Sequence, residues 1–326
     1  MKSLPRLRFA HLPTPIEPLP RLSAALKGPR LWVKRDDQTG LAFGGNKTRK
    51  LEFLVAEAKA HGARTLITAG AVQSNHCRQT AAAAARFGFD CILVLSGNKP
   101  ETVSGNLLLD SLFGAEIVWT EPESRAETLQ QTFDLAWGEG KRPYRIPVGG
   151  SNPTGAAGYV YAIQELIDQF PAGELPDWIV VASSSGGTQA GMVAGAKLFS
   201  FPGKILGISN DENASVLSTL VEKLANETIE FLGVDSKVNS VEILVNDTFL
   251  GAGYGVMGKP EEEAIHLFAS QEGLLLDPVY TGRAAAGLIG LIREGFFKPD
   301  EKVLFWHTGG STALFAEQYQ PAFKGT

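Results

Sequence analysis

The stretch that decides the fold class is residues 178–188, WIVVASSSGGT. Its first five residues are apolar and predict a buried strand over 178–182, and the apolar pattern that resumes at about Gln189 predicts a helix. Between them lies a turn of serines and glycines. A fully apolar strand that leads through a short turn into a helix is typical of parallel sheets covered by helices on both faces.

The same order recurs along most of the chain. Apolar runs predict further strands over residues 31–34, 65–69, 90–95, 116–120, 144–148, 205–209 and 303–307. Helical spacing predicts helices over residues 50–61, 78–87, 106–113, 126–139, 154–170, 210–241, 260–272 and 281–295. We therefore predict the α/β fold class with mainly parallel sheets.

The composition argues against several classes of protein. The formal net charge is −5 and no long basic cluster occurs, so we expect no nucleic-acid partner. The two cysteines, Cys77 and Cys91, are too few for a disulfide framework and lack zinc-site spacing, so we expect a reducing compartment and no metal. The first residues lack the apolar run of a signal peptide, and no stretch approaches the roughly 20 apolar residues of a membrane span. These features predict a cytoplasmic protein.

A lysine follows two glycines in residues 44–52, GGNKTRKLE. The glycines let the backbone approach a ligand closely, and Lys47 lies where a helix is predicted to begin. The positive end of a helix, neighbouring cations and partial burial all lower the pKa of a lysine. A lysine that is partly neutral near pH 7 can form a Schiff base with an aldehyde. The alternative is a solvated basic helix start without a ligand.

Two polar turns follow predicted strands. Residues 70–76, GAVQSNH, precede a helix whose free amides suit a carboxylate, although a plain Ser/Asn helix cap is the alternative. Residues 183–188, SSSGGT, offer small residues, hydroxyls and amides to a phosphate. Because this turn lacks a P-loop lysine and the G-x-G-x-x-G spacing, it favours a monophosphate. Its alternative is a flexible serine-rich turn.

Three further segments combine small and polar residues. Residues 277–282 (DPVYTG) and 307–311 (HTGGS) each end an apolar run. Tyr254 is flanked by glycines in residues 251–255 (GAGYG), which favours its exposure towards a cleft. Taken singly, Tyr254 and Tyr280 are more often structural than catalytic.

Taken together and in this order, the segments resemble the fold-type II pyridoxal-phosphate enzymes, the tryptophan-synthase-β-like superfamily. Within it the chain is similar to the group of D-cysteine desulfhydrase, 1-aminocyclopropane-1-carboxylate (ACC) deaminase and L-cysteate sulfo-lyase, and most of all to the first and the last. The resemblance extends over residues 5–315. The segments that carry it are residues 34–37, 44–51, 73–75, 147–158, 183–191, 253–255, 277–282 and 307–310.

The resemblance implies a particular architecture. Two open, mainly parallel α/β domains would hold pyridoxal 5'-phosphate in the cleft between them. A small domain over residues 51–150 would be inserted into a large cofactor-binding domain made of residues 1–50 and 151–326. Members of the group are usually homodimers, so we expect a homodimer here.

The resemblance also implies roles for individual residues. Lys47 would form the Schiff base with the cofactor, and Asn75 would hydrogen-bond the hydroxyl of the cofactor ring. Ser74, with the amides of Asn75 and His76, would hold the substrate carboxylate. The cofactor phosphate would be bound by Ser185, Gly186, Gly187 and Thr188 with Lys50. The cofactor and substrate would be flanked by Tyr254 and Tyr280. The pyridine nitrogen would be faced by Thr281 with Thr308.

The residue after Tyr280 separates subgroups of this family. The deaminases resemble one another in carrying a glutamate there, whereas this chain has Thr281. A hydroxyl cannot hold a full positive charge on the pyridine nitrogen, so the cofactor is a weaker electron sink. Opening a cyclopropane ring should need the stronger sink, but expelling thiolate or sulfite should not. We therefore predict β-elimination, with D-cysteine converted to pyruvate, ammonia and hydrogen sulfide, after Lys47 or Tyr280 removes the α-proton.

Other functions stay open at this point. L-cysteate sulfo-lyase activity, giving pyruvate, sulfite and ammonia, is the nearest alternative. ACC deaminase activity is disfavoured by Thr281, and amino-acid racemase activity shares the first proton transfer. A non-catalytic module that binds an amino acid or the cofactor is a different class, because fold alone does not give function. The presence of Lys47 and both tyrosines argues against that module.

Overall fold

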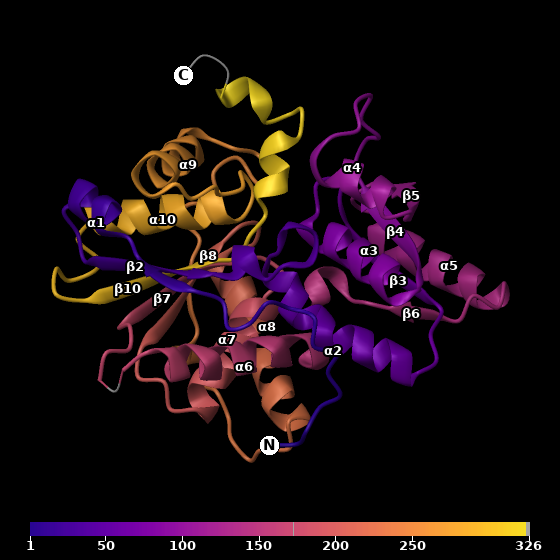
Figure 1. Cartoon of the computed structure of the whole chain (residues 1–326), viewed down its shortest axis with the longest axis horizontal. Helices are drawn as coiled ribbons and strands as arrows, with labels where there is room; N and C mark the ends of the chain where they lie inside the picture. Colours follow the sequence, from indigo (N-terminus) through magenta and orange to yellow (C-terminus); the bar gives the residue numbers. More distant parts are fainter. Residues whose placement is uncertain (172, 324–326) are drawn as a thin grey trace.

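The computed structural model describes residues 1–171 and 173–323. Two β-sheets form its framework (Figure 1). The larger sheet has the order β1 (Ile16–Pro18), β2 (Arg30–Arg35), β10 (Lys302–His307), β7 (Trp178–Ser183), β8 (Lys204–Ser209) and β9 (Leu244–Asn246). The smaller sheet has the order β5 (Glu116–Thr120), β4 (Asp90–Ser96), β3 (Thr65–Ala71) and β6 (Pro143–Arg145). All pairs are parallel except β1 with β2, so the predicted α/β class with mainly parallel sheets is confirmed.

Ten α-helices in the described residues connect and cover these strands. They are α1 (Pro20–Leu26), α2 (Asn46–Ala60), α3 (Asn75–Phe87), α4 (Gly105–Leu112), α5 (Arg125–Gly138), α6 (Pro153–Gln169), α7 (Gly187–Leu198), α8 (Ala214–Phe231), α9 (Lys259–Glu272) and α10 (Thr281–Arg293). Short 3-10 helices cover Asp36–Gln38, Leu41–Phe43, Val148–Gly150, Ser240–Glu242, Ser311–Phe315 and Gln320–Phe323.

The larger sheet is buried on both faces, which explains its uninterrupted apolar strands. Successive residues of a strand point to opposite faces. In β7, Ile179 and Val181 pack with α6, α7 and α8, whereas Val180 and Ala182 pack with α1, α9 and α10. Figure 1 shows α9 and α10 on one side of this sheet and α6 and α7 on the other.

The smaller sheet follows the same rule. In β3, Leu66 packs with α2, α3 and α4, whereas Ile67 and Ala69 pack with α5. Helix α2 contacts both α3 and α6, so it joins the helices of the two sheets. The strands of the smaller sheet lie between Thr65 and Arg145, inside the small domain expected from the sequence. The domain bounds at 51 and 150 stay a prediction.

One predicted helix is wrong in its extent. The helix expected over residues 210–241 is α8, which covers only Ala214–Phe231. Asn213 caps its start by accepting a hydrogen bond from the Val216 amide. Gly233 follows its end with a φ of +70°, a conformation that favours glycine and does not continue a helix. Apolar residues continue past this point, so their spacing overestimated the length of the helix.

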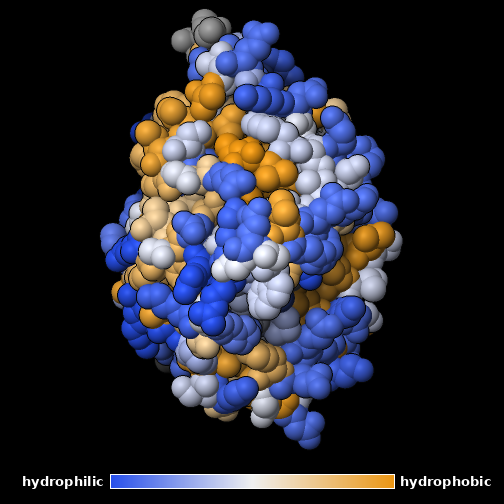
Figure 2. Space-filling model, turned by 90° about the vertical axis from the view of Figure 1, so that its right-hand side faces the viewer, coloured by the Kyte–Doolittle hydropathy of each residue, from blue (hydrophilic) through white to orange (hydrophobic). Residues whose placement is uncertain are grey.

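Several large apolar side chains remain exposed on α4 and α5. Leu112, Leu135 and Trp137 expose 70, 64 and 63 % of their surface. Figure 2 shows the side of the molecule on which these helices lie, with hydrophobic patches among hydrophilic residues. The expected homodimer stays a prediction, and these patches are where a partner would first be sought. Within residues 1–171 and 173–323, no helix combines the length and apolar composition needed to cross a membrane.

Candidate active site

A cavity of about 270 Å³ opens where the carboxyl ends of β3 and β7 face each other. Residues at the ends of parallel strands commonly form ligand sites in α/β proteins. Most of the site residues predicted from the sequence line this cavity. They are Lys47, Ser74, Asn75, His76, Ser185, Gly186, Thr188, Tyr254, Tyr280 and Thr308. Segments far apart in the sequence thus meet as predicted, while the role of each residue stays a proposal.

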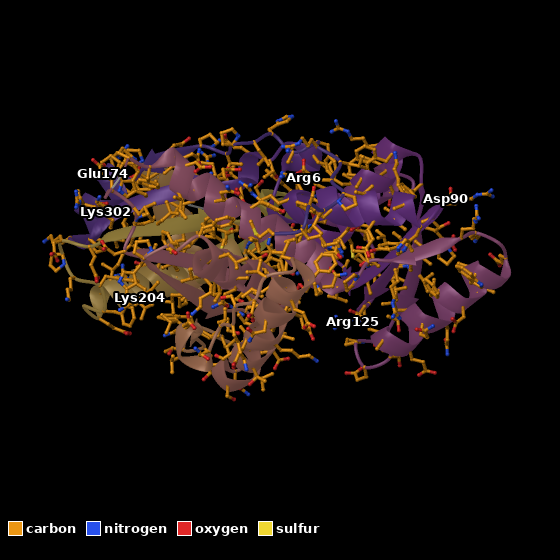
Figure 3. The ribbon with its side chains drawn as sticks, turned by 90° about the horizontal axis from the view of Figure 1, so that it is seen from below. Arg6, Asp90, Arg125, Glu174, Lys204 and Lys302 are labelled. Carbon is orange, nitrogen blue, oxygen red and sulfur yellow. The ribbon has the colours of Figure 1, made fainter. Side chains whose placement is uncertain are left out.

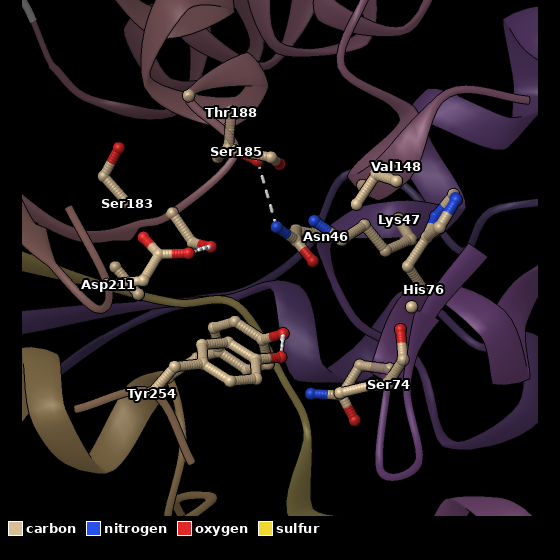
Figure 4. A pocket seen from close by; sticks show the side chains of 18 of the residues that line it. Asn46, Lys47, Ser74, His76, Val148, Ser183, Ser185, Thr188, Asp211 and Tyr254 are labelled. Atoms are coloured by element: carbon tan, nitrogen blue, oxygen red, sulfur yellow. Dashed lines mark hydrogen bonds between the residues drawn. The ribbon is translucent and has the colours of Figure 1, made fainter. Parts of the chain in front are cut away.

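Lys47 lies in the first turn of α2. The two preceding glycines have φ values of +65° and +123°, and a Cβ on Gly44 would lie only 2.0 Å from the Asp37 carbonyl oxygen. Only glycine allows this sharp entry into the helix. The side chain of Lys47 is half-buried, and burial lowers the pKa of its amine to about 8. Figure 4 shows the amine pointing into the cavity, and it donates to no other described residue.

A buried ionic network holds α2 in place. Arg49 donates from Nε to Asp36 Oδ2 at 2.8 Å and from its terminal nitrogens to both oxygens of Glu165 at 2.8 and 2.9 Å. The Tyr159 hydroxyl and the Trp306 indole also donate to Asp36 Oδ2, at 2.6 and 2.8 Å. Burial alone would raise the pKa of Asp36, but Arg49 overcomes this and the pKa is lowered to about 2. The network therefore fixes the turn that carries Lys47.

The serine–glycine turn forms an anion cup at the start of α7. Gly186 precedes the helix with a φ of +73°, and the amides of the first turn have no partners within the helix. The hydroxyls of Ser185 and Ser151 lie 2.8 Å apart. Asn46 donates from Nδ2 to the Thr188 hydroxyl at 3.0 Å, which links the cup to α2. Gly187 lies behind the cavity wall, where a Cβ would approach Ser151 Oγ to 2.4 Å.

The start of α3 forms the opposite wall. Ser74 caps the helix, and its hydroxyl accepts a hydrogen bond from the Cys77 amide at 3.2 Å. Asn106 donates to Asn75 Oδ1 at 2.9 Å, which orients the amide of Asn75. Its Nδ2 is therefore left as a donor without an acceptor among the described residues. These groups offer donors to a carboxylate and to a ring hydroxyl.

His76 lies beside Lys47 on the same wall. Its Nε2 is 2.9 Å from the Thr68 hydroxyl, which donates its proton to the Ile146 carbonyl. Burial, and then the charges of Lys47 and Lys50, hold the pKa of His76 well below its ordinary value. The imidazole is therefore neutral at physiological pH.

Two tyrosines close the cavity on the side of the larger sheet. The hydroxyls of Tyr254 and Tyr280 form a hydrogen bond, and their rings meet edge to face with centroids 5.9 Å apart. Burial raises the pKa of both phenols above the ordinary value. The hydrogen bond between them lowers the pKa of Tyr254 and raises that of Tyr280. Both hydroxyls are therefore protonated at neutral pH.

Two other predicted residues do not line the cavity. Lys50 is buried and donates to the Gly149 carbonyl at 3.0 Å, and burial followed by the charge of Lys47 lowers its pKa well below the ordinary value. Thr281 is buried and donates from Oγ1 to Asp277 Oδ2 at 2.9 Å. The structure thus gives both side chains protein partners, and their roles towards a cofactor stay predictions.

Several residues of the cavity wall were not expected from the sequence. Arg125 reaches it from the start of α5, and Asp211, Glu212 and Leu220 reach it from the opposite side. A signal was available for three of them, because Arg125 follows the predicted strand at 116–120 and the two acids follow the one at 205–209. Parallel strands bring such positions to one edge of a sheet.

The comparisons with known proteins agree with this geometry. A family model of pyridoxal-phosphate dependent enzymes matches residues 7–309. The chain belongs to this family. A solved structure described as an ACC deaminase homologue is 37 % identical, with a TM-score of 0.89, and the match covers 98 % of this chain and 97 % of that one.

Two more distant structures share the fold. A pyridoxal 5'-phosphate-dependent aspartate racemase is 20 % identical with a TM-score of 0.66, covering 91 % of this chain and 90 % of its own. An L-serine ammonia-lyase from Rhizomucor miehei is 16 % identical with a TM-score of 0.69, covering 98 and 99 %. The predicted fold-type II architecture and the predicted cofactor, pyridoxal 5'-phosphate, are thereby confirmed.

The residues present fit this cofactor. An aldehyde needs a partly neutral amine, and the amine of Lys47 has a lowered pKa and no partner in the part of the chain that the structure describes. A monophosphate needs donors at a helix start, and the cup at Ser185–Thr188 supplies amides and hydroxyls. A ring hydroxyl can accept a hydrogen bond from Asn75 Nδ2, which has no acceptor among the described residues.

Proposed function

We propose that this enzyme removes a sulfur group from a three-carbon amino acid by β-elimination. For D-cysteine, the substrate that the sequence favours, one water is consumed and pyruvate, ammonia and hydrogen sulfide are released. The observation that carries the proposal is the placement of Lys47, whose partly neutral amine points into a cavity with anion-binding helix starts on both sides. One helix start suits the cofactor phosphate, and the other suits the substrate carboxylate.

When bound, pyridoxal phosphate withdraws electrons from the α-carbon of an attached amino acid. The chain must then take the α-proton, and the two candidates differ in pKa. Lys47 has a pKa of about 8, so part of it is a free base at neutral pH. The pKa of Tyr280 is raised by burial and by Tyr254, so its phenol keeps its proton. The structure therefore favours Lys47 Nζ as the base.

The tyrosine pair suits the leaving group. One hydroxyl donates to the other, so one proton of the pair stays available to a third group. A thiolate or sulfite that leaves the β-carbon carries negative charge, which this proton can stabilise by a hydrogen bond. The α-carboxylate would accept the donors of Ser74 and of the α3 amides, which hold the Cα–H bond towards Lys47.

L-cysteate is the second candidate substrate. Arg125 lines the cavity, and a sulfonate on the β-carbon would give its guanidinium a partner. ACC is the third, because the ACC deaminase homologue is 37 % identical. We rank it below the others because position 281 carries a hydroxyl instead of a carboxylate.

The test combines one substitution with a substrate panel. Lys47→Ala should remove the visible absorbance of the bound cofactor and all pyruvate formation, whereas Lys59→Ala, an exposed lysine of the same helix, should change neither. The panel contains both enantiomers of cysteine, L-cysteate and ACC. Sulfide with pyruvate identifies a desulfhydrase, sulfite with pyruvate a sulfo-lyase, and 2-oxobutyrate a deaminase. Cofactor absorbance that persists in Lys47→Ala would contradict the assignment of the lysine.

A further inference from the structure

Arg125 is an unpaired cation on the wall of the cavity. It is half-buried and makes no ion pair or side-chain hydrogen bond with the residues that the structure describes. It is also the first residue of α5, where the positive end of the helix disfavours a cation. Since neither a local partner nor the helix stabilises the charge there, its position points to a ligand.

The cavity already has groups for the other anions of the proposed complex. The start of α7 serves the cofactor phosphate, and the start of α3 serves the substrate carboxylate. The lysines and arginines among the described lining residues are Lys47 and Arg125. Because Lys47 is assigned to the cofactor aldehyde, Arg125 is the lining cation left for a third anion.

The position of Arg125 is on the substrate side of the cavity. Helix α5, which Arg125 begins, packs against β3 and β4 of the smaller sheet. Strand β3 leads into the turn that carries Ser74, and both Ser74 and Arg125 line the cavity. Figure 3 shows Arg125 in the part of the molecule built on the smaller sheet, on its side towards the larger sheet.

We propose that Arg125 binds a negatively charged group on the β-carbon of the substrate and so selects amino acids such as cysteate over those with a neutral β-substituent. A guanidinium matches the planar array of sulfonate or carboxylate oxygens with two parallel hydrogen bonds. The inference rests on the proposed function for the identity of the site and narrows its substrates, because among the candidates named there it favours L-cysteate over D-cysteine, whose β-thiol is neutral.

A different role for Arg125 would be to pair with Asp211 and Glu212 and so close the cavity. Both acids line it from the side of the larger sheet. Such closure would improve the binding of every amino acid to a similar extent. Selection by a contact with the β-substituent would instead change the preference between two amino acids. The two roles are therefore separated by a ratio of affinities rather than by one affinity.

The experiment measures dissociation constants of the holoenzyme for L-cysteate and for L-alanine, from the change in visible cofactor absorbance on binding, with the D-enantiomers in parallel. L-alanine lacks both the anion and the leaving group. The variants are Arg125→Gln and Arg125→Lys. The matched control is Arg64→Gln, an exposed arginine just before β3, at the end of the strand away from the cavity.

We expect the wild type to prefer cysteate, and Arg125→Gln to reduce this preference about 10- to 100-fold. Arg125→Lys should keep part of the preference, and Arg64→Gln should keep all of it. An equal loss of affinity for both amino acids, or a wild type without preference, would overturn the inference. Pyruvate release, measured on the same samples, tests the proposed function separately, so either proposal can fail alone.

Discussion

Replacing Asp36 by asparagine should destabilise the enzyme more than any surface substitution. Asp36 is fully buried and accepts hydrogen bonds from Arg49, Tyr159, Trp306 and Thr14. An asparagine keeps the shape but removes the charge and turns one acceptor into a donor. Arg49 then faces a buried NH₂ group instead of a carboxylate oxygen.

The size of the effect follows from two independent estimates. Removing one partner of a buried ion pair costs about 3–5 kcal/mol. The pKa of Asp36 falls from 3.8 to about 2, which corresponds to roughly 2.5 kcal/mol. Because the pKa is lower in the folded state, this contribution is present above pH 4 and is lost as the pH falls from about 4 towards 2.

The assay is thermal unfolding of the holoenzyme at pH 7. At about 2 °C per kcal/mol, Asp36→Asn should lower Tm by roughly 6–10 °C. It should also weaken cofactor binding, because α2 carries Lys47. The control is Glu263→Gln, which breaks an exposed pair with Arg293 and should cost at most about 1 kcal/mol. If Asp36→Asn lowers Tm no more than Glu263→Gln, the network does not hold α2 as argued.

Two further predictions concern the cofactor. Lys47 reacts as the free base, so the apoenzyme should bind pyridoxal phosphate faster as the pH rises. The rate, measured from the visible absorbance, should reach half its maximum near pH 8. A flat rate between pH 7 and 9 would contradict the pKa of about 8. Asn106→Ala removes the shorter of two hydrogen bonds to Asn75 Oδ1, the other being from Arg78 at 3.3 Å, and should weaken cofactor binding about 5- to 10-fold in an equilibrium titration. Unchanged affinity would mean that the orientation of Asn75 is irrelevant.

The order of strands and helices could be predicted because the central strands β3, β4, β7, β8 and β10 are almost fully buried. Burial demands uninterrupted apolar runs, and such runs are visible in one sequence. The three-residue strands β1 and β9 could not be found in this way, since neither is fully buried. The end of α8 was missed because a single glycine, Gly233, stopped a pattern that the apolar residues continued.

The site could be predicted where strand ends carry small and polar residues, as at Ser74 and Ser185. The fold brings such ends to one edge of each sheet, so their meeting needed no knowledge of the tertiary structure. Arg125 also follows a predicted strand, but a lone arginine at a helix start usually lies in solvent, so its place in the sequence does not by itself mark a site. Its role depends on the wall opposite, which is contributed by residues about 90 positions away in the sequence.

The two lysines of α2 show why a lowered pKa by itself does not identify a reactive amine. Burial lowers the pKa of both Lys47 and Lys50, and both lie near the start of the same helix. Lys50 meets the carbonyl of Gly149, which lies 99 residues further along the chain, and is thereby given a structural partner. Lys47 meets no hydrogen-bond partner within residues 1–171 and 173–323, and it opens to the cavity. Reactivity therefore depends on burial without a hydrogen-bond acceptor, a property that the tertiary structure decides and the spacing of residues does not.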